Sequence, residues 1–204
     1  MVAAGSVMVR WTVAAVAMTA LAACATPPAA PDRQDYRVFG PLTVCRGGSV
    51  SNAPPSDERG RIYGYAPYLE IRGRVLARAP VAACLSSGFG VRTSGRMHNG
   101  VDLYTGRPEP VYASGDGVVE SVGALGDYGE TILIRHGAGV MTRYAHLSSY
   151  ASGLRKGARV RAGEPIGETG RTGNATAVHL HYEITVDGEA VNPLIVQAGA
   201  VDMS

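Results

Sequence analysis

The sequence predicts an all-β protein built from short strands, arranged as a sandwich or an open barrel. Its 204 residues include 27 glycines and two phenylalanines, so turns are frequent and large core side chains are few. From Val81 onward, short runs rich in Val, Ile, Leu, Thr and Tyr alternate with glycine-containing turns. Regular short strands separated by such turns are typical of antiparallel β domains rather than of helical ones.

Residues 1–23 form a predicted signal peptide. Arg10 precedes the apolar run Trp11–Ala23, which is too short to be assigned as a membrane span. The run ends in Leu-Ala-Ala-Cys at residues 21–24, which resembles the lipobox of bacterial lipoproteins. This resemblance implies that Cys24 is lipidated and becomes the first mature residue, anchored to a membrane by its acyl chains. The alternative is an ordinary signal peptide with an incidental cysteine.

Residues 24–35 form a predicted linker, because they are rich in Pro and Ala and lack an apolar period. Residues 36–80 follow as an N-terminal extension of unknown role. They contain strand patterns at Tyr36–Phe39 and Tyr68–Ile71 and a polar loop at Ser51–Gly60. Three interpretations of this extension stay open: a lid, a small subdomain, or an additional edge of the sheet.

Two cysteines, Cys45 and Cys84, remain besides Cys24. Because an exported protein folds in an oxidising compartment, an even pair predicts one disulfide. Such a bridge would tie the extension to the start of the main domain. The alternative is a pair of buried free thiols.

The main domain is predicted at residues 81–195, and residues 196–204 are left as a C-terminal tail. Glycine-containing turns bound each predicted strand, and His136, in the sequence His-Gly-Ala-Gly, is interpreted as a turn residue outside the site. The strands predicted in this domain are Val118–Val122, Thr131–Ile134, Val140–His146, Val160–Ile166 and Leu180–Val186.

The formal net charge is +2, and the basic residues are scattered along the chain. Nucleic-acid binding proteins concentrate Lys and Arg in a stripe or patch. The composition therefore predicts no nucleic-acid partner.

Four of the five histidines fall into compact motifs. His98 and Asp102 are four residues apart, so on a strand their side chains share a face, and Gly100 places no side chain between them. His179 and His181 are two residues apart and also share a face, while Leu180 points to the opposite face and fills the core.

A third motif places His146 at the end of another predicted strand. Two histidines and one carboxylate with an open fourth position are typical of a catalytic zinc site, whereas structural sites are usually closed by four protein ligands. The chain has no His-Glu-x-x-His motif, so a mechanism with a glutamate base on a zinc-binding helix does not apply.

These motifs together resemble the lysostaphin-type, or LytM-like, zinc metallopeptidases. The resemblance covers roughly Leu85–Pro193 and implies a LytM-like antiparallel β-sandwich or open barrel of the duplicated hybrid motif type. The matching segments, in family order, are Ser87–Arg92 (F-G-x-R), His98–Asp102 (H-x-G-x-D), Tyr144–Leu147 (Y-x-H-L), Gly170–Glu183 (G-x-T-G … H-L-H-x-E) and Asn192–Pro193.

By position, the resemblance implies roles for five side chains. The implied ligands of Zn²⁺ are His98, Asp102 and His181, and the implied catalytic residues are His146 and His179. Which of these two is the base stays open. Glu183 is interpreted as a solvated carboxylate at a strand end, with a second interpretation as a hydrogen-bond partner of a metal ligand.

The resemblance and the predicted lipid anchor together imply a substrate and a location. The implied substrate is the peptide cross-link between stem peptides of peptidoglycan, cleaved by a DD-endopeptidase, rather than a glycine bridge. Ala25, directly after the cysteine, implies the periplasmic face of the outer membrane. Two alternatives are a LytM-like factor that binds and activates cell-wall amidases without catalysis, and a structural lipoprotein with a vestigial site.

Overall fold

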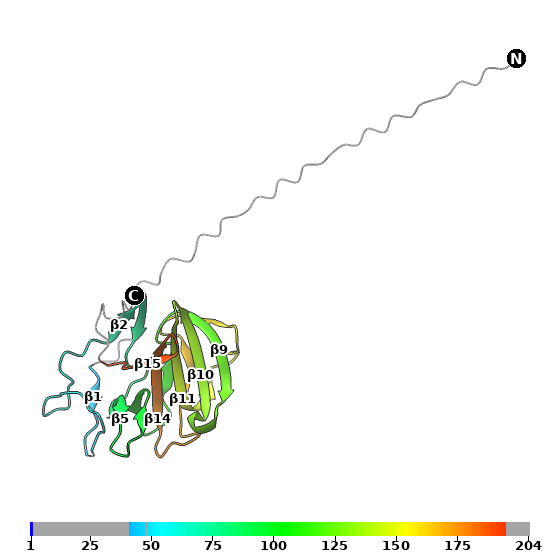
Figure 1. Ribbon diagram of the computed structural model, residues 1–204. Coiled ribbons are helices and arrows are strands. Elements are labelled where there is room, and N and C mark those ends of the chain that lie inside the picture. Colours follow the sequence, from blue (N-terminus) through cyan, green and yellow to red (C-terminus); the bar gives the residue numbers. More distant parts are fainter. Residues whose placement is uncertain (2–40, 48, 195–204) are drawn as a thin grey trace. The chain divides into compact units, whose positions relative to one another are not determined.

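The computed structural model describes residue 1, residues 41–47 and residues 49–194 (Figure 1). Cys24, the predicted strand Tyr36–Phe39 and the predicted tail at 196–204 therefore lie outside the described residues. No α-helix occurs in these ranges, and their one helical element is the 3-10 turn η2 (Gly126–Tyr128). Within the same ranges no helix is long and apolar enough to span a membrane.

An eleven-stranded sheet forms the centre of the described structure. In chain order its strands are β1 (Thr43–Val44), β4 (Cys84–Ser87), β7 (Val101–Tyr104), β8 (Pro110–Tyr112), β9 (Gly117–Ala124), β10 (Glu130–Gly137), β11 (Val140–Tyr150), β12 (Arg159–Val160), β13 (Pro165–Thr169), β14 (His179–Val186) and β15 (Glu189–Val191). The spatial order is β1-β4-β7-β14-β11-β10-β9-β12, with β13 beside β11 and β8, and β15 beside β14. Since this order ends at β1 and β12 without closing, the predicted all-β, open architecture is confirmed.

Two short hairpins lie outside this sheet. One pairs β2 (Tyr68–Ile71) with β3 (Arg74–Ala77), which confirms the strand predicted at 68–71. The other pairs β5 (Gly90–Val91) with β6 (Met97–His98). All strand pairings among the described residues are antiparallel, except for the parallel pair β1–β4.

Strand β14 shows how the sequence pattern builds the core. Leu180, Tyr182 and Ile184 point to one face and are fully buried, as the period-2 pattern predicts. Burying each such side chain contributes about 1.5–3 kcal/mol. The Tyr182 ring packs against Tyr144 of the neighbouring strand β11, with 5.5 Å between ring centroids. The core thus anchors the strand whose opposite face carries His179 and His181.

The single strand predicted at Val160–Ile166 is wrong. The chain forms β12 and β13 there, separated by a turn in which the Glu164 amide donates to the Arg161 carbonyl at 3.0 Å. Gly163 adopts a φ of +77°, which favours glycine and closes the turn. The two strands then pair with different partners, β12 with β9, and β13 with β8 and β11.

The described part of the extension adds an edge to the sheet. Strand β1 pairs with β4, and a disulfide joins Cys45 to Cys84 across 39 residues of sequence, with 5.0 Å between the Cα atoms. The Val44 amide also donates to the Gly60 carbonyl at 2.7 Å. The sequence left three interpretations of the extension open. Strand β1 matches the third of them, an additional edge of the sheet.

The interpretation of His136 as a turn residue is wrong. His136 lies in strand β10, and its side chain is buried. Its Nδ1 atom lies 2.7 Å from the Asp116 carbonyl oxygen and its Nε2 atom lies 2.8 Å from the Thr142 hydroxyl. The hairpin turn starts two residues later than the sequence suggested, at Ala138-Gly139. His136 is therefore part of the core.

Burial lowers the pKa of His136 from its usual value of 6.5, although the hydrogen bond to Asp116 partly offsets this effect. Since the unfolded chain then binds a proton more readily than the folded chain, His136 stabilises the fold above about pH 6.5, and this contribution is lost as the pH falls through the folded pKa. We expect the stability difference between the wild type and His136→Gln to shrink by about 1 kcal/mol between pH 7.5 and pH 5.5. Urea unfolding at both pH values measures this difference, and a constant difference would contradict the expectation.

Candidate metal and catalytic centre

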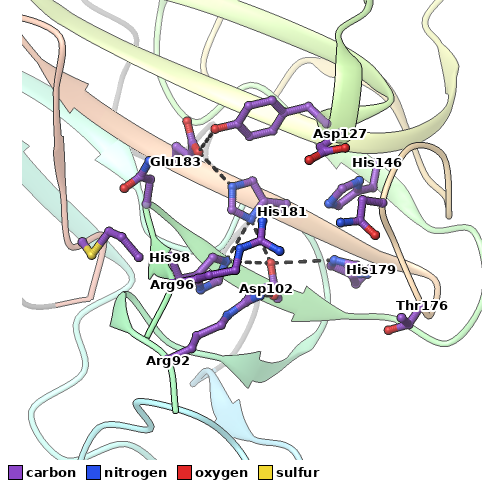
Figure 2. Close-up of a pocket in the computed structure, with 14 residues that line it drawn as sticks. Arg92, Arg96, His98, Asp102, Asp127, His146, Thr176, His179, His181 and Glu183 are labelled. Atoms are coloured by element: carbon purple, nitrogen blue, oxygen red, sulfur yellow. Dashed lines mark hydrogen bonds and ion pairs between the residues drawn. The ribbon is translucent and has the colours of Figure 1, made fainter. Parts of the chain in front are cut away.

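The predicted site residues come from four strands that the sheet brings together. Strand β14, which carries His179 and His181, lies between β7 and β11. Asp102 of β7 is directly opposite His181, and Ala145, next to His146 of β11, is opposite His181 on the other side. His98 ends β6 in the adjoining hairpin. Figure 2 shows the side chains meeting in one cleft.

Three of these side chains converge on one point. The Asp102 Oδ1 atom lies 3.1 Å from His98 Nε2 and 2.8 Å from His181 Nδ1, and the two nitrogens are 3.1 Å apart. All three residues present an oxygen or nitrogen donor within 4.8 Å of the others. The structure therefore brings together the three residues that the sequence predicts as metal ligands.

The expectation that His98 and Asp102 lie on one continuous strand is wrong. Strand β6 ends at His98 and β7 begins at Val101, with a bend between them. Gly100 matters for a different reason from the predicted one. A Cβ atom there would lie 2.3 Å from the Tyr182 carbonyl oxygen, so only glycine lets the bend pass so close to β14.

Hydrogen bonds on the far side of each ring orient the two histidine donors. His98 Nδ1 lies 2.7 Å from the Gly88 carbonyl oxygen, and His181 Nε2 lies 3.0 Å from the Glu183 carboxylate. A neutral ring that donates from those atoms keeps its lone pair on His98 Nε2 and His181 Nδ1, which face the shared point. Ligating histidines in metal sites are usually held this way.

The interpretation of Glu183 as a solvated carboxylate is wrong. Its side chain is only 4% exposed, and it accepts hydrogen bonds from His181, from the Tyr128 hydroxyl at 2.8 Å and from Arg143 at 2.9 Å. Burial acts to raise the pKa of the Glu183 carboxyl, but the hydrogen bonds from His181 and Tyr128 and the positive charge of Arg143 outweigh burial and lower the pKa. Glu183 thus stays ionised and holds the His181 ring.

Asp102 is also ionised. Burial acts to raise the pKa of its carboxyl, but the adjacent His181 and His98 rings outweigh burial and hold the pKa well below its usual range. Its second oxygen, Oδ2, accepts a hydrogen bond from Arg92 at 2.7 Å. The Arg92 contact leaves Oδ1 directed at the two histidines.

The other two histidines, His146 and His179, lie beside this cluster. Their ring centroids are 4.8 Å apart. His146 Nδ1 lies 2.9 Å from the Thr172 carbonyl oxygen, and His179 Nδ1 lies 2.8 Å from the Ala177 carbonyl oxygen. In each ring, donation from Nδ1 leaves Nε2 as the atom that accepts or releases a proton in the cleft.

His146 has a backbone conformation that a regular strand does not provide. Its φ is +62°, in the left-handed region that is uncommon for residues other than glycine. Up to Ala145, β11 pairs with β14, and from Leu147 it pairs with β13. The bend between the two partners turns the His146 side chain towards His179. Burial, together with the neighbouring His179, lowers the pKa of His146 to about 4, so the ring is neutral at pH 7.

The five side chains line a polar cleft of about 480 Å³. The other residues that line it are Arg92, Arg96, Met97, Asn99, Asp127, Tyr128, Asn174, Thr176 and Glu183. The cleft is large enough for a few residues of an extended peptide.

The donor set fits a divalent metal of the zinc type. Two imidazole nitrogens and one carboxylate oxygen are the ligands of many catalytic zinc sites. Bonds of 2.0–2.1 Å at tetrahedral angles place ligand atoms about 3.3 Å apart, close to the 2.8–3.1 Å found between these donors. The side of the donor cluster that none of these three residues occupies faces the cleft.

Residues 96–193 match the model of peptidase family M23. This segment is an M23 peptidase domain. The assignment confirms the predicted LytM-like, lysostaphin-type resemblance and identifies residues 96–193 as a metallopeptidase domain.

Two relatives of the chain have names that state an enzymatic activity. DD-carboxypeptidase/endopeptidase Mpg of Neisseria meningitidis serogroup B is 40% identical over 145 residues, which cover 69% of this chain and 32% of that protein. Peptidoglycan DD-endopeptidase ShyA of Vibrio cholerae serotype O1 is 44% identical over 97 residues, covering 48% of this chain and 22% of that protein. The chain thus spans about a third or less of the length of these curated relatives.

A solved structure supports the same M23 fold. A zinc-containing peptidase from Vibrio cholerae is 31% identical and aligns with a TM-score of 0.56, over 64% of this chain and 46% of that chain.

Sequence reasoning gave the role of Glu183 only as a second interpretation, which the His181 contact confirms, and it missed the other residues that hold the donors in place. The period-2 spacing of His179, His181 and Glu183 was a usable signal, because it puts all three on one face of β14. No comparable signal marks Tyr128, which reaches Glu183 from η2, or the pairing of Arg92 with Asp102. These contacts join segments that are distant in sequence.

Proposed function

We propose that the chain is a zinc-dependent endopeptidase that hydrolyses the peptide cross-links of peptidoglycan, with DD-endopeptidase specificity, in cell-wall remodelling. The convergence of His98, Asp102 and His181 in an open cleft within an M23 domain carries the proposal. The activities stated in the names of Mpg and ShyA support peptidoglycan peptides as the substrate class.

Within this proposal, His98, Asp102 and His181 hold the metal. Zinc, when bound, provides a nucleophile from water at neutral pH and polarises the carbonyl of the substrate. Arg92 orients Asp102 and Glu183 orients the neutral His181 ring through their hydrogen bonds. They perform no chemistry themselves.

His146 and His179 share the proton transfers in this mechanism. Each presents Nε2 to the cleft, because Nδ1 is engaged by a backbone carbonyl. The low pKa of His146 leaves its Nε2 unprotonated at neutral pH, ready to accept a proton. The transfer that completes hydrolysis returns a proton to the leaving amine.

The proposal also includes a location. We propose that acyl chains on Cys24 anchor the protein to the outer membrane, with the M23 domain in the periplasm. The support is the sequence Leu-Ala-Ala-Cys-Ala at residues 21–25. Metabolic labelling with a fatty acid should fail for Cys24→Ser, and intact labelling of that variant would refute the anchor.

Product analysis on purified peptidoglycan tests the activity. The zinc-loaded chain should convert cross-linked muropeptide dimers into monomers, and a chelator should stop the reaction until zinc is restored. Peptides joined by glycine bridges should persist.

A different outcome would favour the non-catalytic alternative. If the protein binds zinc, leaves dimeric muropeptides intact and stimulates an amidase, it acts as an amidase-activating factor. If it does none of the three, a structural role remains.

A further inference from the structure

Two charged side chains of the cleft have no protein partner. Among the described residues, neither the Arg96 guanidinium nor the Asp127 carboxylate makes a hydrogen bond or ion pair. Every other charged group lining the cleft is engaged, as in the pairs of Arg92 with Asp102 and of Glu183 with Arg143. A cleft with one free cation and one free anion can bind complementary charges on a substrate.

The two free charges come from segments on opposite sides of the metal donors. Arg96 comes from the turn that leads into β6, two residues before His98. Asp127 belongs to η2, and its carbonyl oxygen accepts a hydrogen bond from the Asn174 amide at 2.8 Å, beside the Thr172 carbonyl that holds His146. Figure 2 shows Asp127 on the His146 side, whereas the Arg96 side chain runs from the His98 side across the donors. A peptide crossing the donors therefore meets a positive group that comes from the His98 side and a negative group near His146.

Backbone contacts hold the two segments that carry these side chains. The Arg92 amide donates to the Arg96 carbonyl at 2.9 Å, which closes the β5–β6 turn. On the other side, a Cβ atom on Gly173 would lie 2.4 Å from the Asp127 carbonyl oxygen, so η2 packs tightly against the loop after β13. Because both segments are anchored, the backbone that carries each exposed side chain is positioned before a substrate arrives.

We propose that Arg96 binds a free carboxylate on the arm of the substrate that supplies the amine, and that Asp127 binds a free ammonium on the acyl arm. The proposal rests on the peptidoglycan activity proposed above and specifies its substrate. A stem peptide with a diamino acid carries such an ammonium. The residue on the amine side of a D,D bond carries the carboxylate next to the scissile amide, whereas a residue inside a glycine bridge has no such group.

Four synthetic peptides separate the two contacts. The parent is L-Ala-D-isoglutaminyl-L-Lys-D-Ala-D-Ala, and the others carry a C-terminal amide, an acetylated lysine, or both. We expect each block to lower kcat/KM of the wild type about five- to tenfold, since charge-assisted hydrogen bonds at an exposed cleft are of this strength. Arg96→Gln should lose only the preference for the carboxylate, and Asp127→Asn only the preference for the free amine.

Binding provides a readout without turnover. Isothermal titration of the same peptides into the zinc-loaded His146→Ala chain, with and without Arg96→Gln or Asp127→Asn, should show the same two preferences in Kd. Equal kcat/KM and equal Kd for all four peptides would overturn the inference, even if the wild type digests peptidoglycan. Preferential binding without hydrolysis of any substrate would instead sustain the inference and refute the proposed endopeptidase activity.

Discussion

Replacing His181 by alanine is expected to abolish both metal binding and hydrolysis of cross-linked muropeptides. His181 Nδ1 is one of three donors and lies within 3.1 Å of both others. Its loss leaves one nitrogen and one carboxylate, too few ligands for a stable zinc site. We expect metal content measured by mass spectrometry to fall to background. Hydrolysis should fall by more than about a hundredfold, the upper end of the loss caused by removing a partner of a metal ligand.

Two further variants calibrate this result. Glu183→Gln keeps all three donors but weakens the hydrogen bond to His181 Nε2, so zinc affinity should fall by about 10- to 100-fold. His136→Gln removes a histidine that lies in the core and outside the cleft, and it should retain metal and activity. If His181→Ala binds zinc as tightly as the wild type and still cleaves muropeptides, the three residues are not the metal site.

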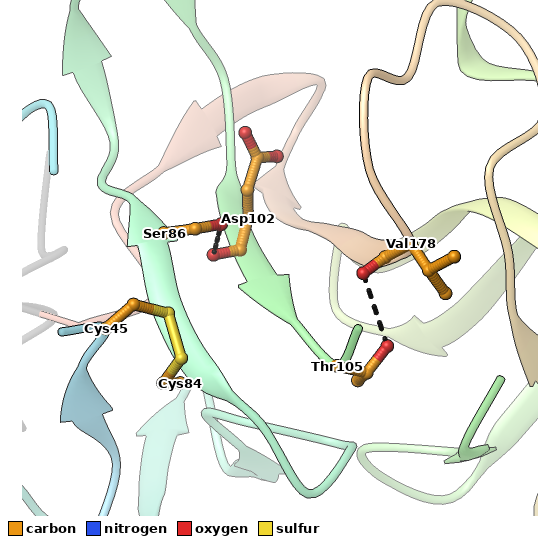
Figure 3. Close-up of a disulfide and its surroundings, with 6 residues drawn as sticks. All are labelled: Cys45, Cys84, Ser86, Asp102, Thr105 and Val178. Carbon is orange, nitrogen blue, oxygen red and sulfur yellow. Dashed lines mark hydrogen bonds between the residues drawn. A yellow bond between two sulfur atoms is a disulfide. The ribbon is translucent and has the colours of Figure 1, made fainter. Parts of the chain in front are cut away.

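Removing the disulfide is expected to lower the free energy of unfolding by about 2–4 kcal/mol. The bridge between Cys45 and Cys84 closes a loop of 39 residues and restricts the unfolded chain (Figure 3). Urea unfolding of Cys45→Ser/Cys84→Ser against the wild type measures the difference. The wild type in reductant provides a matched comparison and should resemble the double variant.

The bridge also lies close to the metal donors. Strand β4 continues from Cys84 to Ser86, whose hydroxyl donates to the Asp102 carbonyl oxygen at 3.1 Å (Figure 3). Asp102 is also held by pairing with β14, so we expect the double variant to keep its zinc content at temperatures where it is folded.

The stability prediction for the double variant has a contrary outcome. An unchanged free energy of unfolding would show that the bridge does not restrict the unfolded chain.

Local patterns predicted much of the strand content, and the resemblance to the LytM-like family implied the identity of the donors. Period-2 spacing in β14 separates Leu180 and Tyr182, which fill the core, from His179 and His181 on the other face. Since this alternation is a property of the extended backbone, it can be read without knowledge of the fold. The disulfide between Cys45 and Cys84 was also predicted without knowledge of the fold, from the even number of cysteines that remain besides Cys24.

Local patterns failed where a partner elsewhere in the chain decides the conformation. The run Val160–Ile166 is apolar enough for one strand, yet its two halves pair with different neighbours and a turn separates them. His136 sits among turn residues in sequence, but burial against Asp116 and Thr142 makes it a core residue. In both places, tertiary contacts outweighed local propensity.

By itself, the sequence determined which side chains could hold a metal, because residue types and the motifs that resemble the LytM-like family are recognised along the chain without the fold. Only the tertiary structure decided how those side chains are held. The change of partner strand puts His146 in a left-handed conformation, and Glu183, Tyr128 and Arg92 meet the donors from segments distant in sequence. The physical reason is that orientation and charge state depend on hydrogen bonds and burial, which exist only after the sheet has assembled.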